Sequence, residues 1–366
     1  MFISIQKKEF AEAVHTVARF AERRSATLPT LSGIAIVAGG DVIKLRATNL
    51  EVGIDLKVEG SIKSEGVVVI PSQVLREIAG SLVGDGLITI EYAGDTAVIT
   101  SGAGKSTVKT LPSDDFPVIP IPNTSEISFS VAGSTLTSLI GSVVACASSS
   151  TVRPDLGSVF LSEAGGILKA VASDSFRLAE KKISVSGNIR PFTALIPAKN
   201  ALDIMQTIPQ TEITVTIDEH QCAFSWEKGM LSTRLVSATY PDYEQIIPKT
   251  FVGEATLLKK DLEAALRRTA VFSDTFQKVR LSLDQKAGNV TLSARNPDVG
   301  ESSDSIRSSA TGESVELSFN HRYLAAPLSL LASESLTLSS GGMGRPLVMK
   351  GSGDSSFLYL VMPMNQ

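Results

Sequence analysis

The sequence predicts an α+β protein of three repeated domains, each with two helices packed on antiparallel strands. Three stretches share one pattern, a short β-rich run followed by a helical run. They are "VVVIPSQVLREIAG" (67–80), "TALIPAKNALDIMQ" (193–206) and "ELSFNHRYLAAPLS" (316–329). Their starts are 126 and 123 residues apart. Self-similarity at a nearly constant spacing indicates a repeated structural unit.

Each of these helical runs begins at a residue that suits a helix start. The three residues are Pro71, Pro197 and Asn320. Proline is compatible with the first helical turn, and asparagine is a favoured cap. A strand followed by an amphipathic helix is expected in each repeat at 3–24, 127–148 and 255–274.

Alternating strands with Gly, Asn and Asp turns complete each repeat. We therefore expect domains at 1–122, 123–248 and 249–366, where the first two repeats end on "DDFPVIP" and "TYPDYEQIIP". Taken alone, the repeat also fits a triplicated scaffold with no particular geometry.

The composition is that of a folded globular protein, with 43% hydrophobic and 20% charged residues. The start "MFISIQKKEF" lacks the apolar core and cleavage site of a signal peptide. No apolar run approaches the roughly 18 residues of a membrane helix. We expect a cytoplasmic protein, in which Cys146 and Cys222 are reduced and buried because no C-x-x-C spacing is present.

Nothing in the sequence nominates a catalytic, cofactor or metal site. "GAGKST" (102–107) resembles the end of a phosphate-binding loop, but Ile99 stands where the first glycine is needed and a hairpin turn fits better. "GGMG" (341–344) also fits a turn. The histidines His15, His220 and His321 have no metal-ligand spacing. An enzyme built on this repeat is therefore the least favoured class.

The net charge of −4 argues against nucleic-acid binding through the whole surface. The charge is nevertheless segregated, because the six predicted helical stretches sum to +5 and the remaining chain to −9. An ordinary solvated helix face explains any single basic residue. The segregation suits a helical layer that meets a polyanion.

Several ordered motifs resemble the bacterial sliding clamp family, the beta subunit of DNA polymerase III. They are "TLPTLSGIAI" (27–36), "TLPSDDFP" (110–117), "VASDSFRLA" (171–179), "YPDYEQIIP" (240–248), "FNHRYL" (319–324) and "YLVMPM" (359–364). The resemblance covers essentially the whole chain. It implies a DNA clamp fold, a head-to-tail homodimer forming a six-domain ring, and helices lining a hole around double-stranded DNA. Such a ring holds DNA topologically and without sequence preference.

The resemblance also implies residues that face DNA and residues that close the ring. The DNA-facing candidates are Arg23, Arg24, Lys199, Lys260 and Arg267. The edge strand "STVKTL" (106–111) should pair with the segment around "TAVFSD" (269–274) of the partner subunit. The interface candidates are Lys105, Val108, Val271, Phe272, Asp298, Glu301 and Asp304. An aromatic residue common in the family is replaced by Ser106.

Family members carry a hydrophobic cleft that accepts short peptides from the DNA polymerase III catalytic subunit, the clamp loader, other polymerases and repair proteins. Carried over by position, the cleft comprises Leu156, Ser173, Ser175, Phe176, Arg177, Leu178, Pro241, Gln245, Ile246, Asn320, Tyr323, Pro346, Leu360, Val361, Met362, Pro363 and Met364. Ser175 and Phe176 replace the usual glycine and histidine, and Gln245 stands where arginine is common.

The apolar C-terminus "FLYLVMPMNQ" is expected to divide into two parts. Residues 357–359 should be the last strand of the third domain, and residues 360–364 should form a wall of the cleft. The resemblance thus implies a non-enzymatic processivity factor without cofactor or metal. The alternative is a clamp-like paralogue that binds partner peptides without encircling DNA.

Overall fold

The computed structural model describes residues 1–22, 28–122, 127–187 and 189–364. The chain divides into two compact units. Unit 1 comprises Met1–Thr137 and Lys199–Leu235, and unit 2 comprises Ser138–Ala198 and Val236–Gln366. The predicted helices are present as α1 (Lys7–Val17), α2 (Ser72–Gly80), α3 (Gly133–Gly141), α4 (Ala198–Met205), α5 (Lys259–Ala270) and α6 (His321–Ala325). Three short 3-10 helices are η1 (Pro29–Ser32), η2 (Val144–Cys146) and η3 (Tyr243–Ile246).

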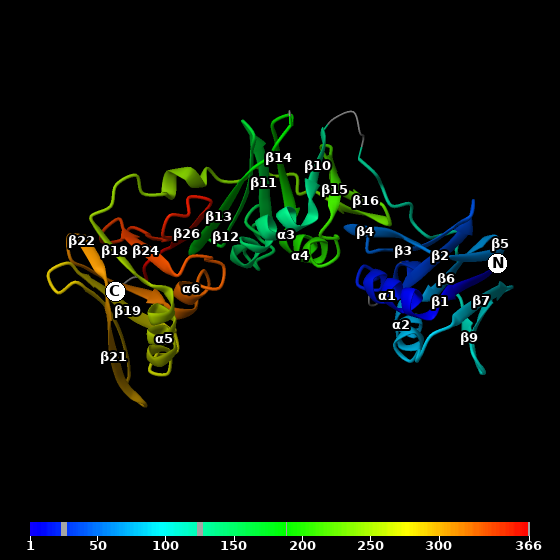
Figure 1. Cartoon of the computed structure of the whole chain (residues 1–366), viewed down its shortest axis with the longest axis horizontal. Coiled ribbons are helices and arrows are strands. Elements are labelled where there is room, and N and C mark those ends of the chain that lie inside the picture. Colours follow the sequence, from blue (N-terminus) through cyan, green and yellow to red (C-terminus); the bar gives the residue numbers. More distant parts are fainter. Residues whose placement is uncertain (23–27, 123–126, 188, 365–366) are drawn as a thin grey trace. The chain divides into compact units, whose positions relative to one another are not determined.

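Unit 1 contains two antiparallel sheets (Figure 1). The five-stranded sheet has the order β5 (Gly60–Ser64), β1 (Phe2–Gln6), β7 (Leu87–Ala93), β8 (Thr96–Ser101) and β9 (Gly104–Lys109). The eight-stranded sheet has the order β10 (Ile127–Ala132), β15 (Glu212–Ile217), β16 (Gln221–Trp226), β17 (Gly229–Arg234), β4 (Val52–Val58), β3 (Val42–Thr48), β2 (Gly33–Gly39) and β6 (Gly66–Pro71).

Unit 2 also contains two antiparallel sheets. The nine-stranded sheet has the order β14 (Phe192–Pro197), β11 (Ser158–Ala164), β12 (Ile167–Ser173), β13 (Arg177–Ser184), β26 (Phe357–Val361), β25 (Leu347–Gly351), β24 (Ser335–Ser340), β18 (Gly253–Leu258) and β22 (Ser309–Gly312). The four-stranded sheet has the order β21 (Gly300–Arg307), β20 (Asn289–Asn296), β19 (Lys278–Asp284) and β23 (Val315–Asn320).

The sheet orders display the threefold repeat. We call β1-β7-β8-β9, β10-β15-β16-β17 and β18-β24-β25-β26 the A arms, and β6-β2-β3-β4, β14-β11-β12-β13 and β23-β19-β20-β21 the B arms. Each repeat supplies one of each. Two joints connect neighbouring repeats, because β17 pairs with β4 and β26 pairs with β13. The strands that correspond to these joint strands in the remaining two arms, β9 in the first repeat and β21 in the third, lie at sheet edges in the described chain.

The helix starts follow the sequence pattern. β6, β14 and β23 end at Pro71, Pro197 and Asn320, and a helix begins at the next residue each time. Pro71 occupies the cap position itself rather than the first helical turn. The Asn320 side chain accepts a hydrogen bond of 2.9 Å from the Arg322 N–H, as expected for a helix cap.

Both glycine-rich motifs lie in turns. The first two residues of "GAGKST" form the turn of an antiparallel hairpin and the other four begin β9. Gly102 in this turn has φ +57°, a conformation that favours glycine. "GGMG" connects β24 to β25. A phosphate-binding loop would instead open a helix, so the hairpin prediction is confirmed.

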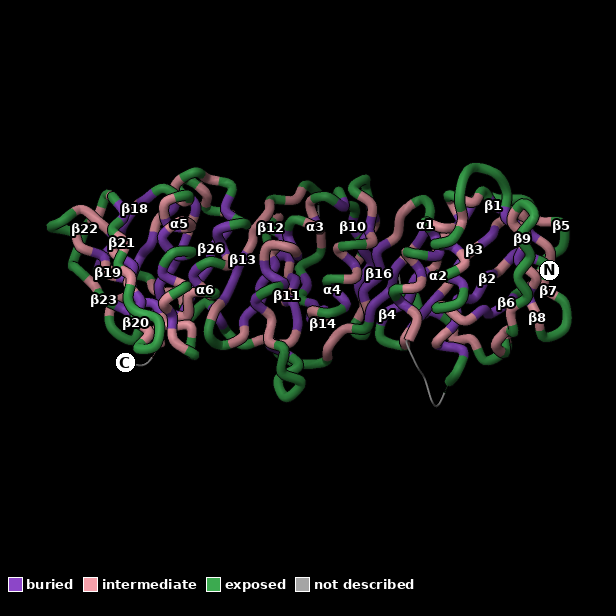
Figure 2. Tube along the Cα trace, turned by 90° about the horizontal axis from the view of Figure 1, so that it is seen from below, coloured by how far each residue is buried: buried purple, intermediate pink, exposed green. Residues whose placement is uncertain are grey.

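Burial follows the helix and strand patterns of the sequence (Figure 2). α1 buries Phe10, Ala13, Val14 and Val17 because these residues share one helical face. Both cysteines are unpaired and buried, as predicted. Among the described residues, no helix is long and apolar enough to cross a membrane.

Candidate functional site

The candidate site of unit 2 lies around a small apolar cluster on one face of the nine-stranded sheet. Its buried members are Val171, Leu178, Tyr243, Val348, Leu358 and Leu360. Residues from the segment 240–251 pack against this cluster together with Phe160 and Met362. Strands from two repeats therefore supply the base of the site, and the connection between those repeats supplies a covering wall.

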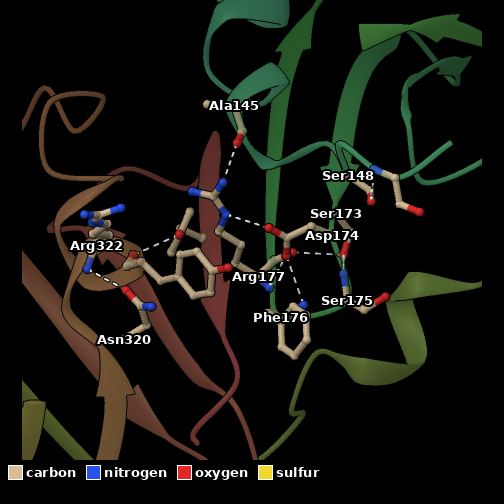
Figure 3. A network of polar contacts seen from close by, with 12 residues as sticks. Ala145, Ser148, Ser173, Asp174, Ser175, Phe176, Arg177, Asn320 and Arg322 are labelled. Atoms are coloured by element: carbon tan, nitrogen blue, oxygen red, sulfur yellow. Dashed lines mark hydrogen bonds and ion pairs between the residues drawn. The ribbon is translucent and has the colours of Figure 1, made fainter. Parts of the chain in front are cut away.

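A tight turn at residues 173–177 joins β12 to β13 and forms one side of the site (Figure 3). Asp174 Oδ1 accepts hydrogen bonds of 3.0 Å from the N–H groups of Phe176 and Arg177. The Ser173 hydroxyl donates to the Arg177 carbonyl (2.9 Å) and accepts from the Ser175 N–H (3.2 Å). Ser175 has φ +75°, so this position requires the left-handed conformation that glycine adopts most readily.

Arg177 connects this turn to the rest of the site (Figure 3). Its Nε donates to Asp174 Oδ2 at 2.9 Å, and its Nη2 donates to the Ala145 carbonyl at 2.7 Å. The guanidinium carbon lies 4.7 Å from the centre of the Tyr323 ring. Because the side chain is only 18% exposed, these contacts are substantially shielded from water. Arg177 thus holds the turn, η2 and α6 together.

The C-terminal segment crosses the site from the turn to β23. The Met362 N–H donates to the Phe176 carbonyl and the Met364 N–H donates to the Ser318 carbonyl, both at 2.8 Å. The expectation that the last strand ends at Tyr359 is wrong. β26 continues through Leu360 to Val361, because it pairs with β13 on one side and β25 on the other.

The η3 helix forms a second wall of the site, because Tyr243 belongs to the apolar cluster. Gln245 Nε2 donates to Asp242 Oδ2 at 2.7 Å, and Ile246 is 48% exposed. Beneath η3, Tyr243 Oη donates to Glu180 Oε2 at 2.5 Å. Burial, assisted by this carboxylate, raises the pKa of Tyr243 above its usual range. No sequence pattern nominated Tyr243 or Glu180, because they are 63 residues apart and meet only through the fold.

Family models of the DNA polymerase III beta subunit match almost the entire chain. The N-terminal domain model matches residues 1–120, the central domain model 130–242, and the C-terminal domain model 244–365. The chain belongs to the DNA polymerase III beta subunit family. This family comprises sliding clamps, which are processivity factors and not catalytic subunits.

Curated relatives and solved structures agree with this assignment. The beta sliding clamp of Pseudomonas putida is 28% identical over 375 residues, covering 100% of both chains. The DnaN sliding clamp from Pseudomonas aeruginosa bound to griselimycin has a TM-score of 0.94 at 27% identity, with 100% of both chains covered. The sliding clamp from Bacillus subtilis has a TM-score of 0.94 at 25% identity, covering 100% of this chain and 99% of that one. The predicted clamp fold is therefore confirmed.

In this member of the beta subunit family, the predicted cleft residues fall into three groups by exposure. Those open to solvent are Ser175, Phe176, Pro241, Gln245 and Ile246. Those partly buried are Arg177, Asn320, Tyr323, Met362, Pro363 and Met364. Those buried are Leu156, Ser173, Leu178, Pro346, Leu360 and Val361. Of the buried group, Leu178 and Leu360 belong to the apolar cluster at the base of the site. A bound ligand would therefore meet chiefly the first two groups. Phe176, 61% exposed, presents the largest apolar side chain among the solvent-open residues.

The predicted DNA-facing residues lie on or beside helices where the structure describes them. Lys199 on α4 and Lys260 on α5 are exposed. Arg267, also exposed, lies 3.7 Å from Glu263 one helical turn earlier. Arg23 and Arg24 lie outside the described residues.

The predicted pairing segment for the edge strand is incorrect. Residues 269–274 are the end of α5 and the turn after it, so they offer no strand. The strand edge beside them is β21, because a Cβ placed at Gly300 would lie 3.6 Å from the Phe272 ring. Val271 is 65% exposed next to this edge.

The predicted interface charges differ in their surroundings. Lys105, Asp298 and Glu301 are exposed. Asp304 instead accepts two hydrogen bonds from Arg268 of the same chain, and this pairing lowers the pKa of Asp304. The carboxylate of Asp304 is therefore already paired with an arginine of its own chain. Among the described residues, no cluster of three or more His, Cys, Asp or Glu side chains could hold a metal ion.

Proposed function

We propose that this chain forms a head-to-tail homodimeric ring that encircles duplex DNA and tethers the replicative polymerase. The observation that carries the proposal is the pattern of joints between the A and B arms. β17 meets β4 and β26 meets β13, whereas β9 and β21 are left at sheet edges. We propose that β9 of one copy and β21 of another form a third joint of the same kind, and two such joints close two copies into a ring.

The two internal joints also predict the register of the third. Leu231 pairs with Ile54, and Tyr359 pairs with Ala179. All four of these residues are the third residue of their strands. The corresponding pair in the third joint is Ser106 in β9 and Ser302 in β21 of the partner copy.

The same register brings the predicted interface residues together. It places Val108 opposite Gly300, beside Phe272. Lys105 falls opposite Ser303 and diagonal to Glu301, where opposite charges attract. Ser106 itself contributes little apolar surface. Leu231 and Tyr359, at the corresponding positions, are fully buried.

Duplex DNA would pass through the ring without sequence readout. Lys199, Lys260 and Arg267, together with Arg23 and Arg24, are the proposed phosphate contacts. A closed ring retains DNA topologically, so strong contacts are not needed. Weak contacts allow the ring to slide along the DNA. Such contacts to phosphate weaken as salt rises.

The cleft of unit 2 is proposed to bind short hydrophobic peptides of the polymerase catalytic subunit, the clamp loader and repair proteins. Met362 and Met364 suit this role because methionine adapts to different apolar partners. Two buried peptide anchors contribute roughly 3 to 6 kcal/mol, against about 8.2 kcal/mol for micromolar binding. Weak, exchangeable association follows, which suits successive partners on one ring.

The proposal is tested by retention on DNA. The protein, loaded by its clamp loader onto nicked circular DNA, should remain bound through gel filtration and should be lost after the circle is linearised. Sedimentation should give a dimer. A monomer that binds polymerase peptides would favour the paralogue acting as a scaffold, and equal retention on circles and linear DNA would contradict topological binding.

A further inference from the structure

A compact charge cluster lies beneath η3 and outside the predicted cleft residues. Glu180 on β13 is 4% exposed. Its Oε1 lies 2.7 Å from Lys182 Nζ, and its Oε2 accepts the Tyr243 hydroxyl at 2.5 Å and lies 3.7 Å from Lys169 Nζ. Lys169 also donates to Glu244 Oε1 at 2.9 Å. The negative charges of two carboxylates therefore balance the positive charges of two ammonium groups. Two members of the cluster, Tyr243 and Glu244, belong to η3.

The backbone bonds of η3 do not fix its position on the sheet. The Tyr243 N–H donates to the Pro241 carbonyl at 2.8 Å, and the Ile247 N–H donates to the Glu244 carbonyl at 3.4 Å. Both bonds lie within the segment itself. The attachment to the sheet therefore depends on side chains, including the stacking of Tyr240 on Phe160 with ring centres 5.0 Å apart.

One flank of the same segment borders open space. A hollow of about 600 Å³ is lined by Phe160, Lys169, Tyr240, Pro241 and Glu244, among others. Close packing does not confine the segment on this flank, so a weakened attachment would allow η3 to shift. Of the contacts from η3 to the sheet, the bond from Tyr243 to Glu180 is charge-assisted and buried. Such bonds are roughly twice as strong as neutral ones.

We propose that Tyr243 and Glu180 are positioning residues of the peptide cleft. They hold η3 so that Gln245 and Ile246 stand at the wall of the cleft, although neither Tyr243 nor Glu180 contacts the peptide. This inference rests on the proposed peptide-binding function. When η3 is displaced, the cleft still binds peptide but without the contact of Ile246, so affinity falls as the fraction of molecules with η3 in place falls.

The test uses the full-length chain and a fluorescein-labelled synthetic peptide carrying the clamp-binding segment of the same organism's DNA polymerase III catalytic subunit. Tyr243→Phe removes only the hydroxyl and leaves the ring contacts and the ion pairs. We expect anisotropy titration to give an affinity about 5- to 10-fold weaker than that of the unchanged protein. The matched control is Tyr240→Phe, because the Tyr240 hydroxyl has no side-chain hydrogen-bond partner among the described residues. Its affinity should stay within about twofold of the original.

A double-mutant cycle separates positioning from general destabilisation. Ile246→Ala should weaken binding by about tenfold in the original chain but only about twofold in Tyr243→Phe, because a displaced wall no longer delivers Ile246. Hydrogen exchange should accelerate in residues 240–247 of Tyr243→Phe and stay unchanged in the four-stranded sheet of unit 2. A general loss of stability would accelerate exchange in both regions.

The outcomes are distinguishable. The positioning role is wrong if Tyr243→Phe binds the peptide as tightly as the original chain. It is also wrong if the fold-losses in affinity of Tyr243→Phe and Ile246→Ala multiply in the double variant. In both cases the proposed peptide binding still stands. If the unchanged protein does not bind the polymerase peptide, the proposed function fails and this inference fails with it.

Discussion

Ring closure by a third joint predicts a measurable effect at Val271. This residue is 65% exposed at the end of α5, and its neighbour Phe272 lies beside Gly300 of β21. In the proposed dimer, Val271 and Phe272 become covered by β9 of the partner copy. Val271→Ala therefore removes apolar surface that only dimerisation buries.

The magnitude follows from the exposed fraction. Valine carries two methyl groups more than alanine, each stabilising by about 0.8 kcal/mol when fully buried. Because 65% of the side chain is still exposed in the single chain, each joint loses about 1 kcal/mol. A ring of two copies has two joints, so the dimer loses about 2 kcal/mol, equivalent to roughly 30-fold in its dissociation constant.

Sedimentation velocity over a dilution series measures this constant directly. The matched control is Val152→Ala, an 83% exposed valine remote in sequence from both joint strands, which should leave the dissociation constant unchanged. Thermal unfolding of both variants should match that of the unchanged chain at dilutions where all are monomers, since neither change empties a buried site. Equal dimer stability in Val271→Ala and the original chain, or equal weakening by Val152→Ala, would refute the third joint.

Three further predictions concern unit 2. Arg177→Ala should destabilise the unit by roughly 2 to 4 kcal/mol and weaken peptide binding, because it leaves Asp174 without its cation. Arg153→Ala, at a more exposed arginine paired with Asp155, should cause a much smaller loss in the same denaturation assay. Truncation after Val361 should abolish peptide binding but preserve dimerisation in sedimentation, since β26 is complete at that residue; unchanged affinity would exclude the tail from the cleft. Burial raises the pKa of Cys146 to about 12. The stability that this thiol contributes is therefore complete below about pH 8.5 and is lost as pH rises toward 12. If the unfolding free energy of Cys146→Ala declined as steeply with pH over this range, this explanation would be contradicted.

Local patterns of the sequence predicted much of the fold. The transitions from strand to helix at Pro71, Pro197 and Asn320 occur as expected, because capping and backbone restrictions act over a few residues. The buried face of α1 and the hairpin at "GAGKST" follow for the same reason. The family motifs predicted the membership that the three domain matches establish. The domain boundaries and the roles of the cleft residues stay predictions.

The tertiary structure decided what depends on pairing between distant segments. The last strand reaches Val361 because β13 and β25 flank it, and no local signal in "FLYLVMPMNQ" carries that information. The strand edge near Phe272 is β21 and not residues 269–274, a distinction that required the sheet order. Likewise, the bond between Tyr243 and Glu180 exists only because the connection to the third repeat folds over β13. The sequence by itself therefore determined the repeats, the element types and the family. Long-range strand pairing and side-chain packing decided which edges remain open and how the walls of the cleft are held.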